Sequence, residues 1–170
     1  HDLPRGEVAQ HIAAHNFVPT PTALIAAAPL ARLGGFTPEL TGVGDWYLWL
    51  RLAFAGARFE VVDERLATYF WHADNMSRSQ VLVMARNQVK ALRWTCDAYP
   101  ERQRSLRGAL RDRERFAGAM ELRQVLNGNL PVAQRGRSLG SAILHRPAGD
   151  AWIDLARKVA LASGRRMPGR

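Results

Sequence analysis

The feature that most constrains the fold is an apolar helix predicted over residues 45–55, "DWYLWLRLAFA". Four apolar side chains recur at the spacing of one buried helix face: Leu48, Trp49, Leu52 and Ala53. Asp45 stands at the start, where a side-chain oxygen can cap a helix, and Gly56 follows the end as a stop signal. Because a helix this apolar has to be covered, the chain must build a core around it.

The segments on either side of this helix predict a mixed fold. Residues 58–62, "RFEVV", and 65–72, "RLATYFWH", are rich in β-branched and aromatic residues and predict two strands around the turn-like "DER". Residues 4–15 predict a helix, and residues 16–27 an extended stretch interrupted by prolines. The order helix, strand, helix, strand, strand favours the α/β class.

After residue 77 the pattern becomes helical throughout. One helix is predicted from Ser77 or Ser79 to about Ala98, and an arginine-rich helix from Pro100 to about Leu126. Two shorter helices are predicted near 132–144 and 149–162, and the last has an amphipathic pattern with a basic end that could touch a membrane surface. Packing against its neighbours is the other interpretation of that helix.

Charge changes at the same place as the structural pattern. Residues 1–75 hold five Arg and eight Asp or Glu, a balance of −3, whereas residues 76–170 hold nineteen Lys or Arg and seven acids, a balance of +12. We therefore predict two domains, residues 1–77 and residues 78–170. A basic second domain fits either a solvated surface or contact with polyanions or anionic lipid.

Composition excludes several classes of protein. No apolar run reaches the length of about 18–20 residues that a membrane-spanning helix needs. The first ten residues lack the apolar core of a secretory signal, and a single cysteine, Cys96, excludes an internal disulfide framework. These features predict a soluble protein of the cytoplasm, or one bound to the periphery of a membrane.

Four segments in order resemble a known family of enzymes: "NFVPTPTALI", "LARLGGF", "TGVGDWYLWLRLAFAGARFEVV" and "LATYFWHADNMS". Together, over about residues 10–77, they resemble the C-terminal half of the catalytic domain of family 2 glycosyltransferases, the inverting GT-A type. The resemblance implies the C-terminal part of a Rossmann-like nucleotide-diphospho-sugar transferase domain, followed by a helical extension. It also implies transfer of a sugar from a nucleotide-sugar donor to an acceptor hydroxyl with inversion.

The resemblance assigns roles to individual residues. Asp45 matches the catalytic base, Gly34 and Gly35 match the loop beside the donor sugar, and His72 matches a metal ligand. Trp46 is a candidate for stacking on the acceptor. The acidic residue that precedes the base in the family is replaced by Gly44.

The chemistry of an inverting transfer is consistent with these residue types. One carboxylate must take the proton of the acceptor hydroxyl, while Mg²⁺ or Mn²⁺ neutralises the developing diphosphate charge. The resemblance implies a glycan or lipid-linked acceptor, as in the synthesis of cell-envelope polysaccharide, and no nucleic-acid partner. Simpler interpretations remain open: Asp45 as a helix cap, the glycines as a helix stop and His72 as a surface side chain.

Part of the family pattern is missing from these residues. No Asp-x-Asp motif and no phosphate-binding glycine loop are present. The resemblance therefore predicts a chain that begins midway through a catalytic domain and is inactive by itself. The alternative is a non-catalytic module in which the basic helices bind nucleic acid, an anionic membrane or a protein partner.

Overall fold

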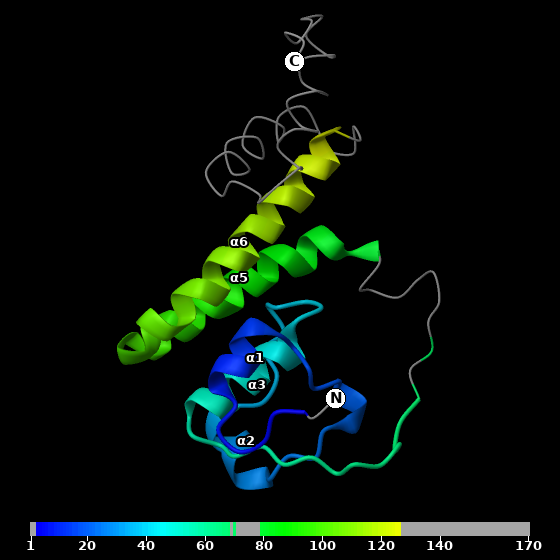
Figure 1. The fold of residues 1–170 in the computed structure, drawn as a ribbon, viewed down its shortest axis with the longest axis vertical. Helices are drawn as coiled ribbons and strands as arrows, with labels where there is room; N and C mark the ends of the chain where they lie inside the picture. The colour runs from blue at the N-terminus through cyan, green and yellow to red at the C-terminus, as the bar shows by residue number, and fades with distance from the viewer. Residues whose placement is uncertain (1–2, 69, 71–78, 127–170) are drawn as a thin grey trace, which may run out of the picture. The chain divides into compact units, whose positions relative to one another are not determined.

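The computed structural model describes residues 3–68, 70 and 79–126. The elements follow in the order α1 (Ala9–Ala14), η1 (Thr20–Thr22), α2 (Ala27–Leu33), α3 (Gly44–Phe54), α5 (Val81–Ala98), η2 (Pro100–Arg102) and α6 (Gln103–Leu126) (Figure 1). The chain divides into two compact units, residues 1–110 and residues 111–170, and α6 is a continuous helix that runs through the boundary.

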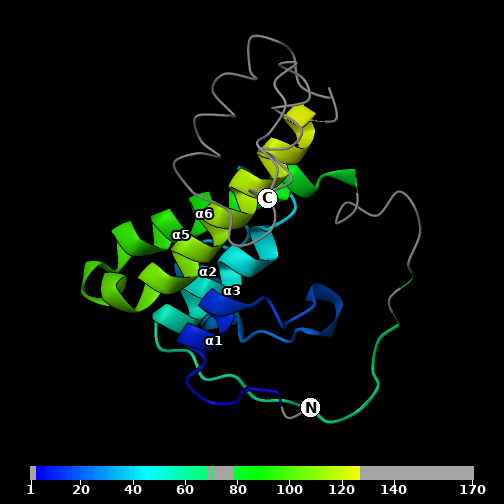
Figure 2. The same ribbon diagram turned by 45° about the horizontal axis from the view of Figure 1, so that its top comes forward.

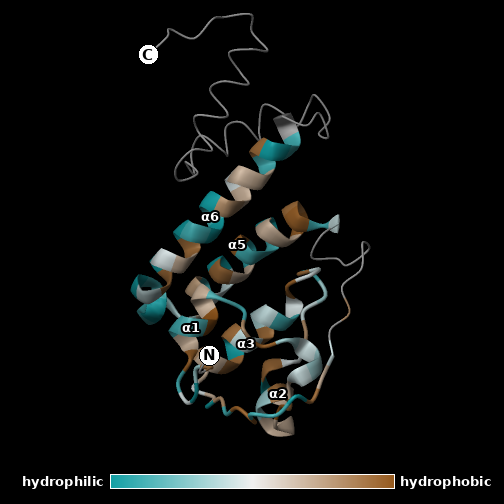
Figure 3. Cartoon of the chain, turned by 45° about the vertical axis from the view of Figure 1, so that its right-hand side comes forward, coloured by the Kyte–Doolittle hydropathy of each residue, from teal (hydrophilic) through white to brown (hydrophobic). Residues whose placement is uncertain are grey.

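The core of the first unit is built around α3, as its sequence predicts. This helix contacts α1, α2 and α5, and two views show α1 beside it (Figures 1 and 2). The predicted apolar face is confirmed, and burial extends further around the helix to Trp46 and Leu50. In the hydropathy view, α1 and α3 both carry apolar segments coloured brown beside polar ones (Figure 3), and their buried residues share one apolar cluster. Burial of so many large side chains is the main source of stability in this unit.

Two tryptophans of α3 fix the chain that leaves α1. The indole N–H of Trp46 donates to the carbonyl of Ile12 at 2.7 Å, and that of Trp49 donates to the carbonyl of Val18 at 3.0 Å. Both rings are 1% exposed, so each bond satisfies a carbonyl beside the core as well as the indole itself. Residues 12–18 are thereby held against α3 without belonging to a sheet.

The predicted α/β class is wrong for the part of the chain that is described. No strand occurs there, and the only pairing of β type is an isolated antiparallel bridge between Gly6 and Phe59. Residues 57–68 follow an extended path (Figure 1), but Val62, Leu66 and Phe70 are 66%, 71% and 78% exposed. Strand propensity gives a strand only where a second extended segment pairs with the first, and the only such pairing among the described residues is the single bridge between Phe59 and Gly6.

The resemblance to family 2 glycosyltransferases is corrected by the same finding. A GT-A domain requires a central β-sheet, and the described residues form a helical structure instead. The sequence motifs match only short segments of that family. They therefore carry no information on whether the predicted strands pair with other strands. The GT-A assignment is therefore contradicted.

The helices after the extended segment agree with the sequence pattern. The first, α5 (Val81–Ala98), begins after Gln80 with no side-chain cap and ends at the predicted Ala98, and it buries Leu92 and Cys96. The second is confirmed by η2 and α6, which together cover residues 100–126. The helices predicted near 132–144 and 149–162, and the domain boundary predicted at residue 77, fall outside the described residues. None of the described helices is long and apolar enough to cross a membrane.

Candidate functional site

The carboxylate of Asp45 lies in the first turn of α3 and is half-buried. Its Oδ1 accepts a hydrogen bond from the backbone N–H of Trp46 at 2.7 Å, and its Oδ2 accepts one from the hydroxyl of Thr20 at 2.8 Å. The N-cap position itself belongs to Val43, so Asp45 is not the helix cap. One carboxylate oxygen is thus fixed by the backbone, and the other faces a hydroxyl group.

The hydroxyl of Thr20 is positioned by a short, rigid turn. Pro19 and Pro21 fix the backbone on either side of it, since the proline ring restricts φ. The turn closes on the carbonyl of Pro19, which accepts bonds from the backbone N–H of Thr22 at 3.0 Å and from its hydroxyl at 2.8 Å. The bond from Trp49 to Val18 anchors the residue before the turn. Residue 20 therefore meets residue 45 in a defined geometry.

This arrangement has the geometry of a general base. A base must lie within about 2.6–3.2 Å of the oxygen whose proton it takes, and the Thr20 hydroxyl lies in that range of Oδ2. Since a carboxylate oxygen can accept more than one hydrogen bond, Oδ2 can receive a second hydroxyl beside Thr20.

Gly34 and Gly35 end α2 in a Schellman motif. The N–H of Gly34 bonds to the carbonyl of Ala31 at 3.2 Å, and that of Gly35 to the carbonyl of Leu30 at 3.3 Å. Their φ angles are 74° and 69°, a region that favours glycine. The guanidinium of Arg51 donates to the carbonyls of Leu33 and Gly35 and so ties this loop to α3. The loop of Gly34 and Gly35 is therefore hydrogen-bonded to Arg51, and Asp45 is hydrogen-bonded to Thr20. The predicted donor loop and the predicted base have different partners.

Replacing Gly34 with alanine is expected to lower the free energy of unfolding by about 1–2 kcal/mol. A Cβ at this position would meet no atom within 4 Å, so the cost comes from the positive φ and not from a steric clash. Urea denaturation followed by circular dichroism would measure the change. Ala31→Gly, in the same helix, is the control for a general effect on α2. Unchanged stability in Gly34→Ala would contradict the Schellman assignment.

The remaining predicted site residues have different positions. Trp46 is buried, and its indole N–H donates to the carbonyl of Ile12, so its ring belongs to the core. His72 lies outside the described residues. Within the described ranges, no group of three or more His, Cys, Asp or Glu side chains could hold a metal ion. The described residues therefore provide no ligand set for the predicted Mg²⁺ or Mn²⁺.

A stack of cations and aromatic rings joins α3 to α5 and was missed by the sequence analysis. The Arg51 guanidinium lies 4.9 Å from the centre of the Tyr47 ring, which meets the Trp94 ring edge-on at 5.6 Å. The Lys90 amine lies 4.4 Å from the centre of the Trp94 ring. Burial raises the pKa of Tyr47, and the nearby Arg51 charge opposes that rise. This stack braces the helix that carries Asp45.

Comparison of the chain with protein families, curated proteins and solved structures gives no match. The comparisons therefore give no support to the expected membership in family 2, which the helical structure of the described residues already contradicts. Among the described residues, Asp45 and Thr20 form a carboxylate–hydroxyl pair of the kind that proton transfer requires.

Proposed function

We propose that this chain supplies the base in a glycosyl transfer, in which a sugar moves from a nucleotide-sugar donor to an acceptor hydroxyl with inversion. The observation that carries the proposal is the hydrogen bond of 2.8 Å from the Thr20 hydroxyl to Oδ2 of Asp45. This bond supports the proposal because Oδ2 of Asp45 is oriented to accept a hydrogen bond from a hydroxyl group. The proposal concerns the reaction and makes no use of a GT-A fold.

The proposed step can be written with its bonds balanced. The acceptor oxygen attacks the anomeric carbon of the donor, and a new C–O bond forms as the bond to the nucleoside diphosphate breaks. The diphosphate leaves with the bonding electron pair, and the acceptor proton passes to Oδ2 of Asp45. Since attack occurs opposite the leaving group, the configuration at the anomeric carbon inverts.

Thr20 acts in this proposal as a positioning residue. Its hydroxyl orients the Asp45 carboxylate through one bond, and the Trp46 N–H orients it through the other. An acceptor hydroxyl can bind to the remaining lone pair of Oδ2 without displacing Thr20. This preorganisation keeps the base aligned before the acceptor binds.

The test is a transfer assay on the product of the complete open reading frame that contains these residues. A panel of nucleotide sugars would be supplied with glycan and lipid-linked acceptors, and release of nucleoside diphosphate would be followed. We expect release that depends on an acceptor, and NMR of the product should show the inverted anomer. EDTA would test the predicted need for Mg²⁺ or Mn²⁺. Absence of acceptor-dependent release with every donor, or a retained configuration, would overturn the proposal.

A further inference from the structure

The hydroxyl of Thr20 has the position of a nucleophile in its pair with Asp45. It donates to Oδ2 of the carboxylate at 2.8 Å, and Oδ1 of the same carboxylate accepts the backbone N–H of Trp46 at 2.7 Å. A hydroxyl, a base within hydrogen-bond reach of it and a third group that orients the base are the signature of an activated nucleophile. The fold therefore assembles this signature on a hydroxyl of the chain itself.

The direction of this hydrogen bond leaves the Thr20 oxygen able to attack. A hydroxyl group has one proton and two lone pairs. Since the proton points to Asp45, both lone pairs point away from the carboxylate. The oxygen can therefore form a new bond on one side while its proton passes to Oδ2 on the other.

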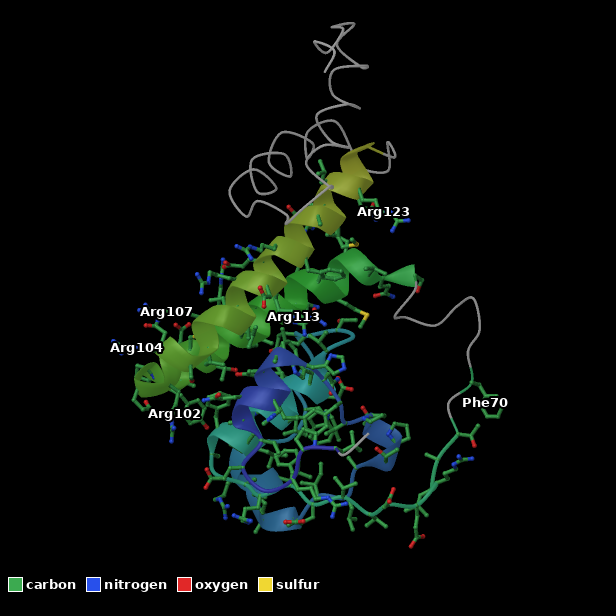
Figure 4. The ribbon with its side chains drawn as sticks, in the orientation of Figure 1. Phe70, Arg102, Arg104, Arg107, Arg113 and Arg123 are labelled. Carbon is green, nitrogen blue, oxygen red and sulfur yellow. The ribbon has the colours of Figure 1, made fainter. Side chains whose placement is uncertain are left out.

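The turn that carries this hydroxyl is accessible to a donor. Residues 19–22 are all exposed, and Figures 2 and 4 show η1 at the edge of the group formed by α1, α2 and α3. The two prolines restrict the backbone on both sides of Thr20, so its hydroxyl is already in place. A hydroxyl held in this way avoids the entropy that a separate acceptor loses on binding.

A second threonine in the same turn has no base beside it. The hydroxyl of Thr22 is also exposed, but it donates to the carbonyl of Pro19 at 2.8 Å. A backbone carbonyl accepts a hydrogen bond but is far too weak a base to take the proton at neutral pH. The two threonines are therefore distinguished by the partner of the hydroxyl, and only Thr20 is activated.

We propose that Thr20 is a site of self-glycosylation, an inference that rests on the proposed function and names a second acceptor for it. Oγ1 of Thr20 attacks the anomeric carbon of the donor, and a new C–O bond forms as the bond to the nucleoside diphosphate breaks. The diphosphate leaves with the bonding electron pair, and the hydroxyl proton passes to Oδ2 of Asp45. Thr20 positions the base when another acceptor is bound, and it receives the sugar when none is bound.

Mass spectrometry of a tryptic digest tests the proposal. The product of the complete open reading frame would be incubated with each nucleotide sugar of the panel and no acceptor, and then digested. Cleavage after Arg5 and Arg32 gives a peptide of residues 6–32, in which Thr20 and Thr22 are the only hydroxyl side chains. We expect this peptide to gain a single sugar, located on Thr20 by electron-transfer fragmentation. Release of nucleoside diphosphate should stop at one equivalent per chain, because the glycosylated oxygen has no proton left to transfer.

A matched set of variants assigns the roles. Thr20→Val should lose the modification, and Thr20→Ser should keep it, because serine retains the hydroxyl. Thr22→Val makes the same change two residues away and should be modified at a rate within about fivefold of the unchanged protein, since it loses one neutral hydrogen bond. Asp45→Asn should slow the modification by about 10²–10⁴-fold.

The outcomes separate this inference from the proposed function. Transfer to an added acceptor, with no sugar on the peptide of residues 6–32, would overturn the inference and leave the proposed function standing. A sugar on Thr22 in place of Thr20, or an equal rate of modification in Asp45→Asn, would also overturn the inference. Absence of transfer with every donor, both with and without an acceptor, would overturn the two together.

Discussion

Replacing Trp46 with alanine is expected to lower the free energy of unfolding by about 3–5 kcal/mol, the usual cost of deleting a large buried ring. The ring is 1% exposed at the centre of the α3 core. Its loss leaves a cavity and also removes the donor to the Ile12 carbonyl. Urea denaturation followed by far-ultraviolet circular dichroism would measure the change as a shift of the midpoint.

Two further variants separate the contributions to this effect. Trp46→Phe keeps most of the ring but leaves the Ile12 carbonyl without its indole donor, so a cost of about 1–3 kcal/mol is expected. Phe36→Ala removes a ring that is 53% exposed and should cost less than about 1 kcal/mol. A Trp46→Ala protein as stable as Phe36→Ala would show that α3 is not the centre of the core.

Replacing Asp45 with asparagine is expected to lower the rate of sugar transfer by about 10²–10⁴-fold, the usual contribution of a general base. Asparagine has nearly the same shape, and its carbonyl can still accept a bond from Thr20 or from the Trp46 N–H. It cannot accept the acceptor proton at neutral pH, so turnover should fall without loss of the fold. Release of nucleoside diphosphate under saturating donor and acceptor would measure the rate.

Thr20→Val is the matched comparison for this variant. Valine has nearly the same shape as threonine but removes the hydroxyl that donates to Oδ2, so Asp45 loses one positioning bond and keeps its carboxylate. A fall in turnover of about tenfold or less is expected, because one neutral hydrogen bond contributes about 1 kcal/mol. Normal turnover in Asp45→Asn, with circular dichroism unchanged, would remove Asp45 from the mechanism.

The helices could be predicted from the sequence because their signals are local. The spacing of Leu48, Trp49, Leu52 and Ala53 defines one face of α3, and that face is buried. The end of α6 near Leu126 also agrees with the predicted range. In contrast, residues 58–62 have the composition of a strand, but a strand needs a pairing partner, which can come from any other part of the chain. The α/β prediction failed at that step.

The candidate site shows the same division between local and distant information. The position of Asp45 at the start of α3 follows from the apolar pattern that comes after it. The role of Thr20 does not, because 25 residues separate it from Asp45, and only the folding of the proline turn against α3 brings the two together. The two prolines around Thr20 were the available signal that this hydroxyl is held in place.

The extended segment after α3 has a consequence for handling the protein. Proteases bind their substrates as extended, accessible backbone, and Arg58 and Arg65 lie in such a stretch with exposed side chains. Trypsin can therefore cleave the segment between α3 and α5 at these two arginines. A nick there would leave α1, α2 and α3 on one fragment and α5 and α6 on the other, and the contacts between α3 and α5 would still hold the two fragments together.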